Sequence, residues 1–293
     1  MHEPHDEWLF GWDETPGIVS IHAGLDGRAI VWRRIPESGT LVREEERFRP
    51  WLLLEHIEDL SHLGQALGRG ENSSAVVRHR ELDGPGALRH LVSADDGRAL
   101  VSAVLRGASA RLGRRIAHLA ELGPETVLSL PPEEQYLVAT GRTYFRNLRF
   151  DDLHRLQFDL ETTGLDARSN RIFMISIRYH TGETEVLEAL GDDDSAEADL
   201  LRLLESRVRA ADPDVIENHN LHGFDLPFLD QRSRKLGVAL SLGRTGGPGL
   251  RQRAARRGAP SGDPADRRRV RFVAPGRELI DTLDAVRRHD FST

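Results

Sequence analysis

Two acidic side chains, Asp159 and Glu161, stand two positions apart at the end of an apolar stretch that begins at Leu156. In a β-strand, residues two positions apart point to the same face, so the two carboxylates should lie side by side. Unpaired negative charges in such a place need a cation, and carboxylate oxygens are the hard ligands that Mg²⁺ and Mn²⁺ prefer. The pair therefore indicates a divalent-metal site. The plainer alternative is a strand end whose acids reach solvent.

A third acid, Asp225, ends a polar stretch that starts at Asn218 and precedes Pro227. Proline is favoured in the first turn of a helix, and the residues before Asn218 form a short apolar strand pattern. A strand, a loop and a helix in this order place Asp225 at the carboxyl end of a sheet, where open α/β sheets carry their sites. Alternatively, Asp225 caps the helix. The loop histidines His219 and His222 have a ligand-like spacing but are also typical of a solvated loop.

The bulk composition is that of a globular protein. The chain has 293 residues, 39% hydrophobic and 30% charged, and this length allows two domains of ordinary size. No apolar run approaches the roughly 18–20 residues of a membrane span, and the polar N-terminus is unlike a signal peptide. The absence of cysteine excludes disulfides and Cys-ligated metal sites. We therefore expect a cytoplasmic protein with no membrane partner.

The charge balance, a formal net charge of −7, argues against coating of nucleic acid by the whole surface. It is compatible with a local basic channel. Nearly all positive charge is arginine, since Lys235 is the only lysine. The segment from Gly243 to Gly276 is rich in arginine, glycine and proline and poor in apolar residues, which predicts a loop or hairpin. It either touches phosphates or forms an ordinary surface loop; its arginines include Arg251, Arg253, Arg256, Arg257 and Arg267–Arg269.

The elements around the acids predict a mixed α/β domain. After the strand with Asp159 and Glu161, strands are expected over 171–179 and 183–189, joined at Gly182 as an antiparallel meander. An amphipathic helix over 195–210 and a buried strand over 214–217 complete the order β-β-β-α-β.

The region before residue 130 predicts a smaller α+β domain without obvious chemistry. Two consecutive prolines, Pro131 and Pro132, are expected to stop regular structure before a short helix over 135–142. The other expected elements are strands over 8–12, 17–22, 29–32, 49–54 and 75–82 and helices over 59–67 and from 95 or 96 to about 112. His2 and His5 could bind metal, but a polar terminus explains them as well.

Two motifs in this order resemble a known family. Phe158-Asp-Leu-Glu-Thr-Thr163 and, some sixty residues later, Asn220-Leu-His-Gly-Phe-Asp225 are similar to the first two exonuclease motifs of family B DNA polymerases. Glu134–Gly141 resembles the connector that precedes the exonuclease domain, and Gly276–Asp284 resembles the strand and helix that follow the second motif. The resemblance implies an α/β fold: a ribonuclease H-like exonuclease domain with a mixed sheet and flanking helices over 131–293, preceded by the smaller α+β domain over 1–130.

The resemblance also implies 3′→5′ exonuclease chemistry with two Mg²⁺ or Mn²⁺ ions. Carried over to this sequence, Asp159 would bridge the two ions, Glu161 would bind the nucleophile-side ion, and Asp225 would hold the second. Two metals in such a site generate hydroxide and stabilise both oxygens of an in-line displacement.

The substrate implied is single-stranded DNA or the frayed 3′ end of a primer. Thr162 and Thr163 would lie against the 3′-terminal nucleotide, and Asn220 and Phe224 would face the incoming strand. A single strand needs little more from the protein than such a groove.

The chain departs from the family pattern near its end. The third motif, Tyr-x-x-x-Asp or similar, supplies a fourth carboxylate, yet no tyrosine follows Tyr179. Asp281, Asp284 and Asp290 come too early to replace it. We therefore expect an N-terminal piece of a longer protein, with a polymerase domain downstream and a metal site that lacks its fourth carboxylate. The alternatives are a non-catalytic nucleic-acid-binding module with an incomplete metal site and an RNA-directed nuclease on the same fold.

Overall fold

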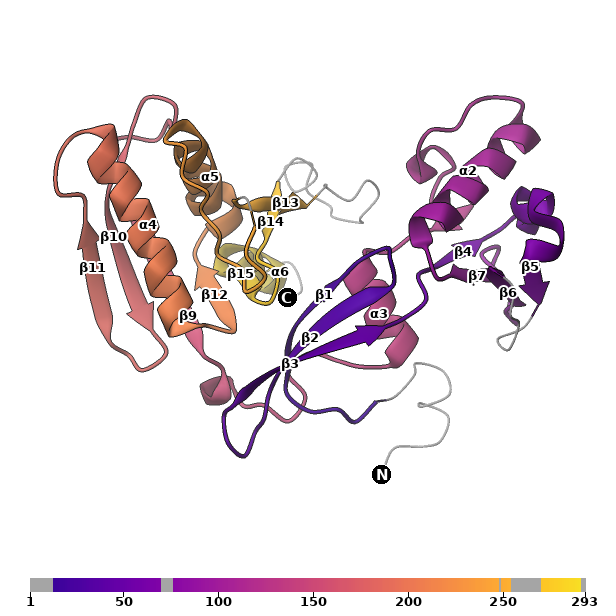
Figure 1. Ribbon diagram of the computed structural model, residues 1–293, viewed down its shortest axis with the longest axis horizontal. Helices are drawn as coiled ribbons and strands as arrows, with labels where there is room; N and C mark the ends of the chain where they lie inside the picture. The colour runs from indigo at the N-terminus through magenta and orange to yellow at the C-terminus, as the bar shows by residue number, and fades with distance from the viewer. Residues whose placement is uncertain (1–12, 70–75, 248, 254–269, 291–293) are drawn as a thin grey trace. The chain divides into compact units, whose positions relative to one another are not determined.

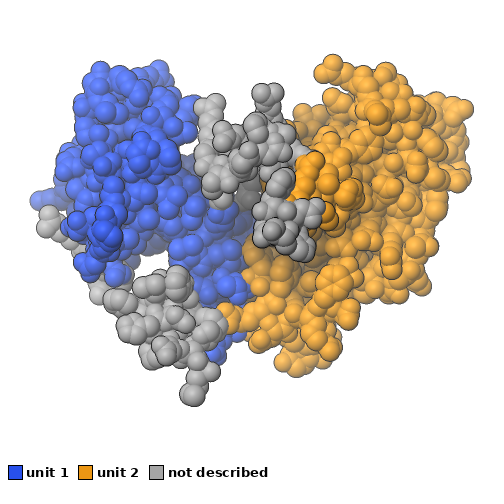
Figure 2. Space-filling view, turned by 180° about the vertical axis from the view of Figure 1, so that it is seen from behind, with its two compact units in different colours: residues 1–15, 21–31, 43–143 blue, residues 16–20, 32–42, 144–293 orange. Residues whose placement is uncertain are grey.

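The computed structural model describes residues 13–69, 76–247, 249–253 and 270–290 (Figure 1). The expected strand over 8–12, His2, His5 and the arginines between 254 and 269 lie outside the described residues. Contacts divide the chain into two compact units, coloured separately in Figure 2. Unit 1 is made mainly of Ile21–Val31 and Arg43–Thr143, and unit 2 of Pro16–Ser20, Trp32–Val42 and the chain from Tyr144 onward.

Unit 1 contains a five-stranded sheet packed against one long helix, α2 (Gly97–Leu112). The helix begins where predicted, because the side chain of Asp96 accepts hydrogen bonds from the backbone N–H groups of Arg98 and Ala99. Leu100 and Val104 of this helix are buried against the sheet. Across the sheet, the strands are β5 (Leu67–Arg69), β6 (Val77–Glu81), β7 (His90–Ala94), β4 (Trp51–Leu54) and β8 (Val127–Leu128).

Two predictions for this part of the chain need correction. Regular structure does not stop at the prolines: Pro132 is the first residue of helix α3 (Pro132–Thr140), since a first helical position leaves its N–H unbonded anyway. The helix expected over 59–67 is a 3₁₀ helix, η1 (Ile57–Ala66), broken at Gly64, whose φ is 52°. The remaining elements are the sheet β1 (Ile18–Ala23), β2 (Arg28–Arg34) and β3 (Leu41–Arg47), and the 3₁₀ turns η2 (Leu119–Glu121) and η3 (Phe150–Asp152).

Unit 2 is built on a second five-stranded sheet. As predicted, β10 pairs antiparallel with both β9 and β11, while β12 runs parallel to β9 and β15. The predicted mixed sheet and β-β-β-α-β order are thus observed. Across the sheet, the strands are β11 (Thr184–Glu188), β10 (Ile172–Tyr179), β9 (Arg155–Thr162), β12 (Val215–Asn218) and β15 (Glu278–Asp281).

One face of this sheet is buried under helices. Helix α4 (Asp194–Ala211) lies along β10 and β11 (Figure 1), with Leu200, Leu201, Leu204 and Val208 in the core. Strand β9 sends Leu156, Phe158 and Leu160 into the same core, so its odd-numbered residues face the opposite side. The other helices are α5 (Leu226–Lys235) and α6 (Thr282–Asp290), with the π-helical turn η4 (Leu221–Asp225) leading into α5.

The arginine-rich segment forms a hairpin base, which agrees with the loop or hairpin predicted. Strand β13 (Arg251–Arg253) pairs antiparallel with β14 (Arg271–Val273). Phe272 is buried against the core of unit 2, so this base belongs to the folded unit.

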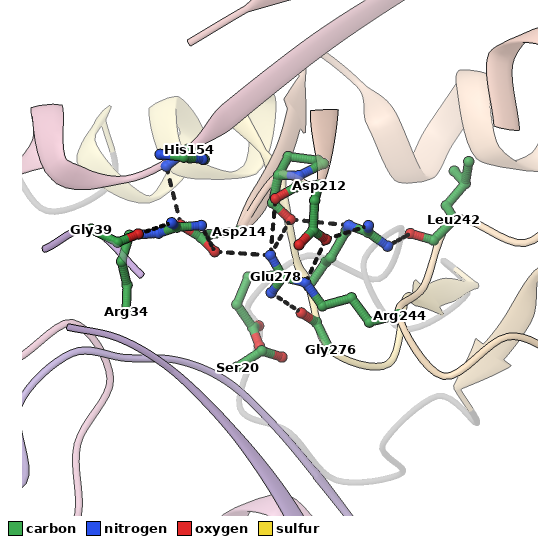
Figure 3. Close-up of polar contacts among 12 residues, drawn as sticks. Ser20, Arg34, Gly39, His154, Asp212, Asp214, Leu242, Arg244, Gly276 and Glu278 are labelled. Atoms are coloured by element: carbon green, nitrogen blue, oxygen red, sulfur yellow. Dashed lines mark hydrogen bonds and ion pairs between the residues drawn. The ribbon is translucent and has the colours of Figure 1, made fainter. Parts of the chain in front are cut away.

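A buried ion cluster fixes the start of β12 (Figure 3). Asp214, fully buried, accepts hydrogen bonds from Arg34 Nε at 2.6 Å and Nη2 at 2.9 Å, and from Arg244 Nη2 at 3.0 Å. The backbone N–H of His154 donates to the same carboxylate at 3.1 Å. Burial works to raise the pKa of Asp214, but the hydrogen bonds and charges of Arg34 and Arg244 outweigh it and lower the pKa.

A third arginine completes the cluster. Arg277 donates to the carbonyl oxygens of Pro213 and Leu242 and, through Nη2, to Asp212 Oδ1 at 2.8 Å. Burial, followed by repulsion from Arg244, lowers the pKa of Arg277 to about 10. Three arginines on two aspartates form a network in which each buried charge depends on the others.

Replacing Asp214 by asparagine should therefore destabilise unit 2 strongly. The D214N variant leaves the buried guanidinium of Arg34 without its anion and Arg244 with Asp212 alone, and we expect it to lose about 3–5 kcal/mol of unfolding free energy in urea titrations. The matched change D199N removes an exposed aspartate that pairs with Arg202, and it should alter stability by no more than about 0.5 kcal/mol. Equal effects of the two substitutions would contradict this assignment.

Candidate functional site

The first two candidate acids lie on the open face of β9. Asp159 is opposite Ser176 and Glu161 opposite Met174 on β10, and both acids are exposed. Among the residues that the structure describes, neither carboxylate has a hydrogen-bond or ion-pair partner. The side-by-side placement predicted from their spacing is therefore observed, and both carboxylates are open to a ligand.

The turn after these acids is braced by its own side chains. Thr162 Oγ1 donates to the carbonyl oxygen of Gly164 at 3.0 Å, and Thr163 Oγ1 accepts from the backbone N–H of Arg171 at 3.1 Å. A Cβ at Gly164 would come within 2.7 Å of Asn170 Oδ1, so a larger residue there would displace the Asn170 side chain. The next residue, Leu165, has 85% of its surface exposed, and no sequence pattern marked it as a functional residue.

Asp225 does not cap helix α5, although that was the plainer interpretation of the sequence. It has right-handed helical dihedrals at the end of the π-helical turn and makes no capping hydrogen bond through its side chain. The side chain is buried, with 1% exposure, and Oδ1 has no hydrogen-bond partner among the described residues. A buried carboxylate oxygen without a donor is costly, so this oxygen is suited to a cation.

Electrostatics around Asp225 indicate that the acids are close together. Burial first, and then the negative charge of Asp159, raise the pKa of Asp225 to about 7. Asp281 adds to the rise. The nearby Asn218 amide lowers the pKa of Asp225, although Asn218 Nδ2 makes no hydrogen bond of standard geometry. Asp159 on β9 thus lies near enough to Asp225 for its negative charge to act on that carboxylate.

The donor set has the chemistry of a divalent-metal site, but it is not a closed cage. Carboxylate oxygens that lack partners are the ligands that Mg²⁺ and Mn²⁺ prefer. In the described part of the chain, no three side chains of the His, Cys, Asp and Glu types are grouped as a metal-binding cluster. The residues therefore fit a cation by type and environment.

The loop between β12 and α5 has an irregular backbone. Asn220 adopts left-handed dihedrals, with φ at 63°, and Phe224 is half-buried with its ring centroid 5.5 Å from that of Phe228. His222 is buried rather than solvated, because its Nδ1 accepts the backbone N–H of Phe272 at 3.2 Å. Asn220, His222 and Gly223 also line a cavity of about 540 Å³.

Asp281 joins this site although its position in the chain argued against a role as the fourth carboxylate. It ends β15, opposite Asn218 of β12. Its carboxylate accepts the backbone N–H groups of Asn220 at 2.9 Å and His222 at 3.0 Å. Asp284 lies in the first turn of α6 and Asp290 ends that helix. The feature that brings Asp281 to this site is the parallel pairing of β15 with β12, so a prediction of that pairing would have identified the residue.

Comparison with known proteins supports the fold assignment. The family described as the RNase_H superfamily matches residues 156–243. The structure of the family B DNA polymerase from the hyperthermophilic archaeon Pyrobaculum calidifontis covers 92% of this chain, with a TM-score of 0.61 and 20% sequence identity. The predicted ribonuclease H-like fold is thereby confirmed.

Sequence comparison finds relatives that are named as DNA polymerases. DNA polymerase 2 of Aeropyrum pernix is 35% identical over 96 residues, which cover 31% of this chain and 12% of that protein. A DNA polymerase of Pyrococcus glycovorans is 32% identical over 132 residues, covering 42% of this chain and 17% of that protein. The chain thus spans less than a fifth of each of these relatives and 37% of the Pyrobaculum polymerase chain. Within the described residues, none of the helices has the length and apolar character of a membrane span.

Removing the charge of Asp225 should stabilise the metal-free protein in a pH-dependent way. Because the folded pKa, about 7, lies above the ordinary value of 3.8, the buried charge is a full penalty above pH 7 and disappears as the pH falls toward 3.8. We expect D225N to raise the unfolding free energy at pH 8 in EDTA by at most about 4 kcal/mol, with the gain shrinking steadily toward pH 4.5.

Thermal and urea unfolding across that range measures the effect. The exposed variant D199N should give no such trend. A D225N variant that is less stable than the parent at pH 8 would show that the carboxylate has a partner after all.

Proposed function

Because this chain resembles the N-terminal and exonuclease region of family B DNA polymerases in sequence and in its ribonuclease H-like fold, we propose that it removes nucleotides from the 3′ end of single-stranded DNA. In the cell, the substrate would be the frayed 3′ end of a primer, and the region would work as the proofreading part beside a polymerase domain. The observation that carries the proposal is the buried Oδ1 of Asp225 after β12, which lacks a hydrogen-bond partner among the described residues and lies in the field of Asp159, whose open face of β9 Glu161 shares.

The residues that would hold metal are these three acids. Asp159 and Asp225 already influence one another electrostatically, and Glu161 shares the open face of Asp159. Two Mg²⁺ or Mn²⁺ ions bound there would supply a hydroxide nucleophile and neutralise charge on the phosphate under attack. The raised pKa of Asp225 describes the metal-free site, where that carboxylate must share its region with another negative charge.

The chain's own contribution to substrate binding is the rim around the acids. The Thr162–Gly164 turn is stabilised by hydroxyl hydrogen bonds, and it is followed directly by the exposed side chain of Leu165. Leu165 is suited to contact the apolar face of a terminal base. Asn220, held in its left-handed conformation, and the half-exposed edge of Phe224 would lie along the strand.

Cleavage of 5′-labelled single-stranded DNA in Mg²⁺ or Mn²⁺ tests the proposal. We expect stepwise loss of nucleotides from the 3′ end, abolished by EDTA and reduced at least about 10²–10³-fold in D159A, because loss of a metal ligand removes several kcal/mol of transition-state stabilisation. The exposed variant D199A should cleave at the parent rate.

Other outcomes of this assay would overturn the proposal in distinct ways. DNA binding without cleavage at saturating metal would identify a non-catalytic binding module. Faster degradation of RNA than of DNA, or cuts within the strand, would identify an RNA-directed or endonucleolytic enzyme on the same fold.

A Leu165→Ala variant should bind single-stranded DNA less tightly while keeping its catalytic step. Losing one apolar contact of this size is worth about 1–2 kcal/mol, so we expect KM for a 3′-unpaired oligonucleotide to rise about 5–30-fold with kcat nearly unchanged. Steady-state kinetics measures both constants, with Leu112→Ala, an exposed leucine of unit 1, as the control. An unchanged KM would remove Leu165 from the substrate rim.

A further inference from the structure

Asp281 makes contacts that are unusual for a carboxylate at the end of a strand. It is 5% exposed and accepts three backbone N–H groups: Oδ1 accepts those of Asn220 and Leu283, at 2.9 and 3.1 Å, and Oδ2 accepts that of His222 at 3.0 Å. The bond to Leu283 belongs to the start of helix α6. The other two bonds cross to the loop after β12, about sixty residues earlier in the chain.

That loop needs an outside acceptor to keep its shape. Asn220 has left-handed dihedrals, which are unfavourable for a residue with a Cβ, and a π-helical turn follows directly. In the first turn of a helical segment the backbone N–H groups have no partner within the helix. Asp281 accepts two such groups, and Asp225 is the last residue of the same turn.

We propose that Asp281 is a positioning residue for the 3′-exonuclease reaction: its carboxylate fixes the turn from Asn220 to Asp225 and so holds Asp225 toward Asp159. The inference rests on the proposed function. Asp281 acts through Asp225 rather than on the substrate or the metal, because both of its oxygens are already engaged by backbone donors.

The strand arrangement explains why this residue suits the task. Asp281 and Asn218 are opposite one another in the parallel pair β12–β15, so the carboxylate projects at the level where the loop leaves the sheet. An anion is stronger than a neutral acceptor toward N–H groups.

The test compares D281N with D284N in the whole chain. Asn at position 281 keeps one acceptor and turns the other into an N–H₂ group that faces a backbone donor, so at least one bond to the loop is lost. Asp284 is equally buried, three residues later, and pairs with Arg271 on β14 instead of the loop. It is therefore a matched control.

For D281N we expect kcat on 5′-labelled single-stranded DNA to fall about 10–100-fold, with KM within about threefold of the parent. Raised Mn²⁺ concentration should restore part of the activity, because a displaced ligand weakens metal binding without removing it. D284N should keep parent kinetics. D281E, which retains two charged acceptors, should lie between the parent and D281N.

Hydrogen exchange provides a readout that does not depend on cleavage. The amides of Asn220 and His222 should exchange at least about tenfold faster in D281N than in the parent, and at the parent rate in D284N. Parent-like kcat and exchange in D281N, or the same losses in D284N, would overturn the proposal.

A parent chain that does not cleave DNA would refute the proposed function and remove the reaction from the inference. In that case, faster exchange and weaker Mn²⁺ binding in D281N would still show that Asp281 positions the turn. A D281N variant that does not fold shifts the kinetic and exchange tests to D281E, where parent-like values for both would overturn the proposal.

Discussion

The arrangement of unit 2 depends on one buried carboxylate, that of Asp214. Its side chain is held by Arg34 and Arg244, while its backbone N–H donates to the carbonyl oxygen of His154 and its own carbonyl accepts the N–H of Glu278. His154 precedes β9, Asp214 precedes β12 and Glu278 begins β15, so this residue ties together the amino ends of three neighbouring strands. The opposite ends of the same strands carry Asp159, the loop to Asp225, and Asp281. Geometry fixed at one edge of the sheet thus sets which acids meet at the other.

Local patterns in the sequence were sufficient for most of this sheet. The alternation of apolar and polar residues in β9 predicted the shared face of Asp159 and Glu161, and the turn at Gly182 predicted the antiparallel meander. In the separate β1–β2–β3 sheet, strand β3 was not predicted. Its sequence, Leu-Val-Arg-Glu-Glu-Glu-Arg, is mostly charged and carries no apolar alternation.

Contacts between distant residues were beyond such patterns. Arg34 meets Asp214 from 180 positions away, and Asp281 meets Asn220 from 61. Local propensity also misjudged Asp225 and His222. Both have residue types common in solvated loops and caps, but tertiary packing buries them and gives Asp225 a role unrelated to capping. The resemblance to a family predicted one site for these acids, and the structure places the charge of Asp159 near Asp225.

Two buried aspartates eleven positions apart, Asp214 and Asp225, show how the fold separates stability from chemistry. Arginines surround the first, and its pKa is lowered; no cation accompanies the second among the described residues, and its pKa rises to about 7. A fold selected only for stability would pair or replace the second carboxylate, since an unpaired buried charge is among the costliest features of a protein interior. Strain of this kind collects where function needs it. The arginine cluster at the amino ends of the strands offsets the cost of the buried Asp225 charge at their carboxyl ends. It holds the strands in register, and its arginines do not pair with Asp225.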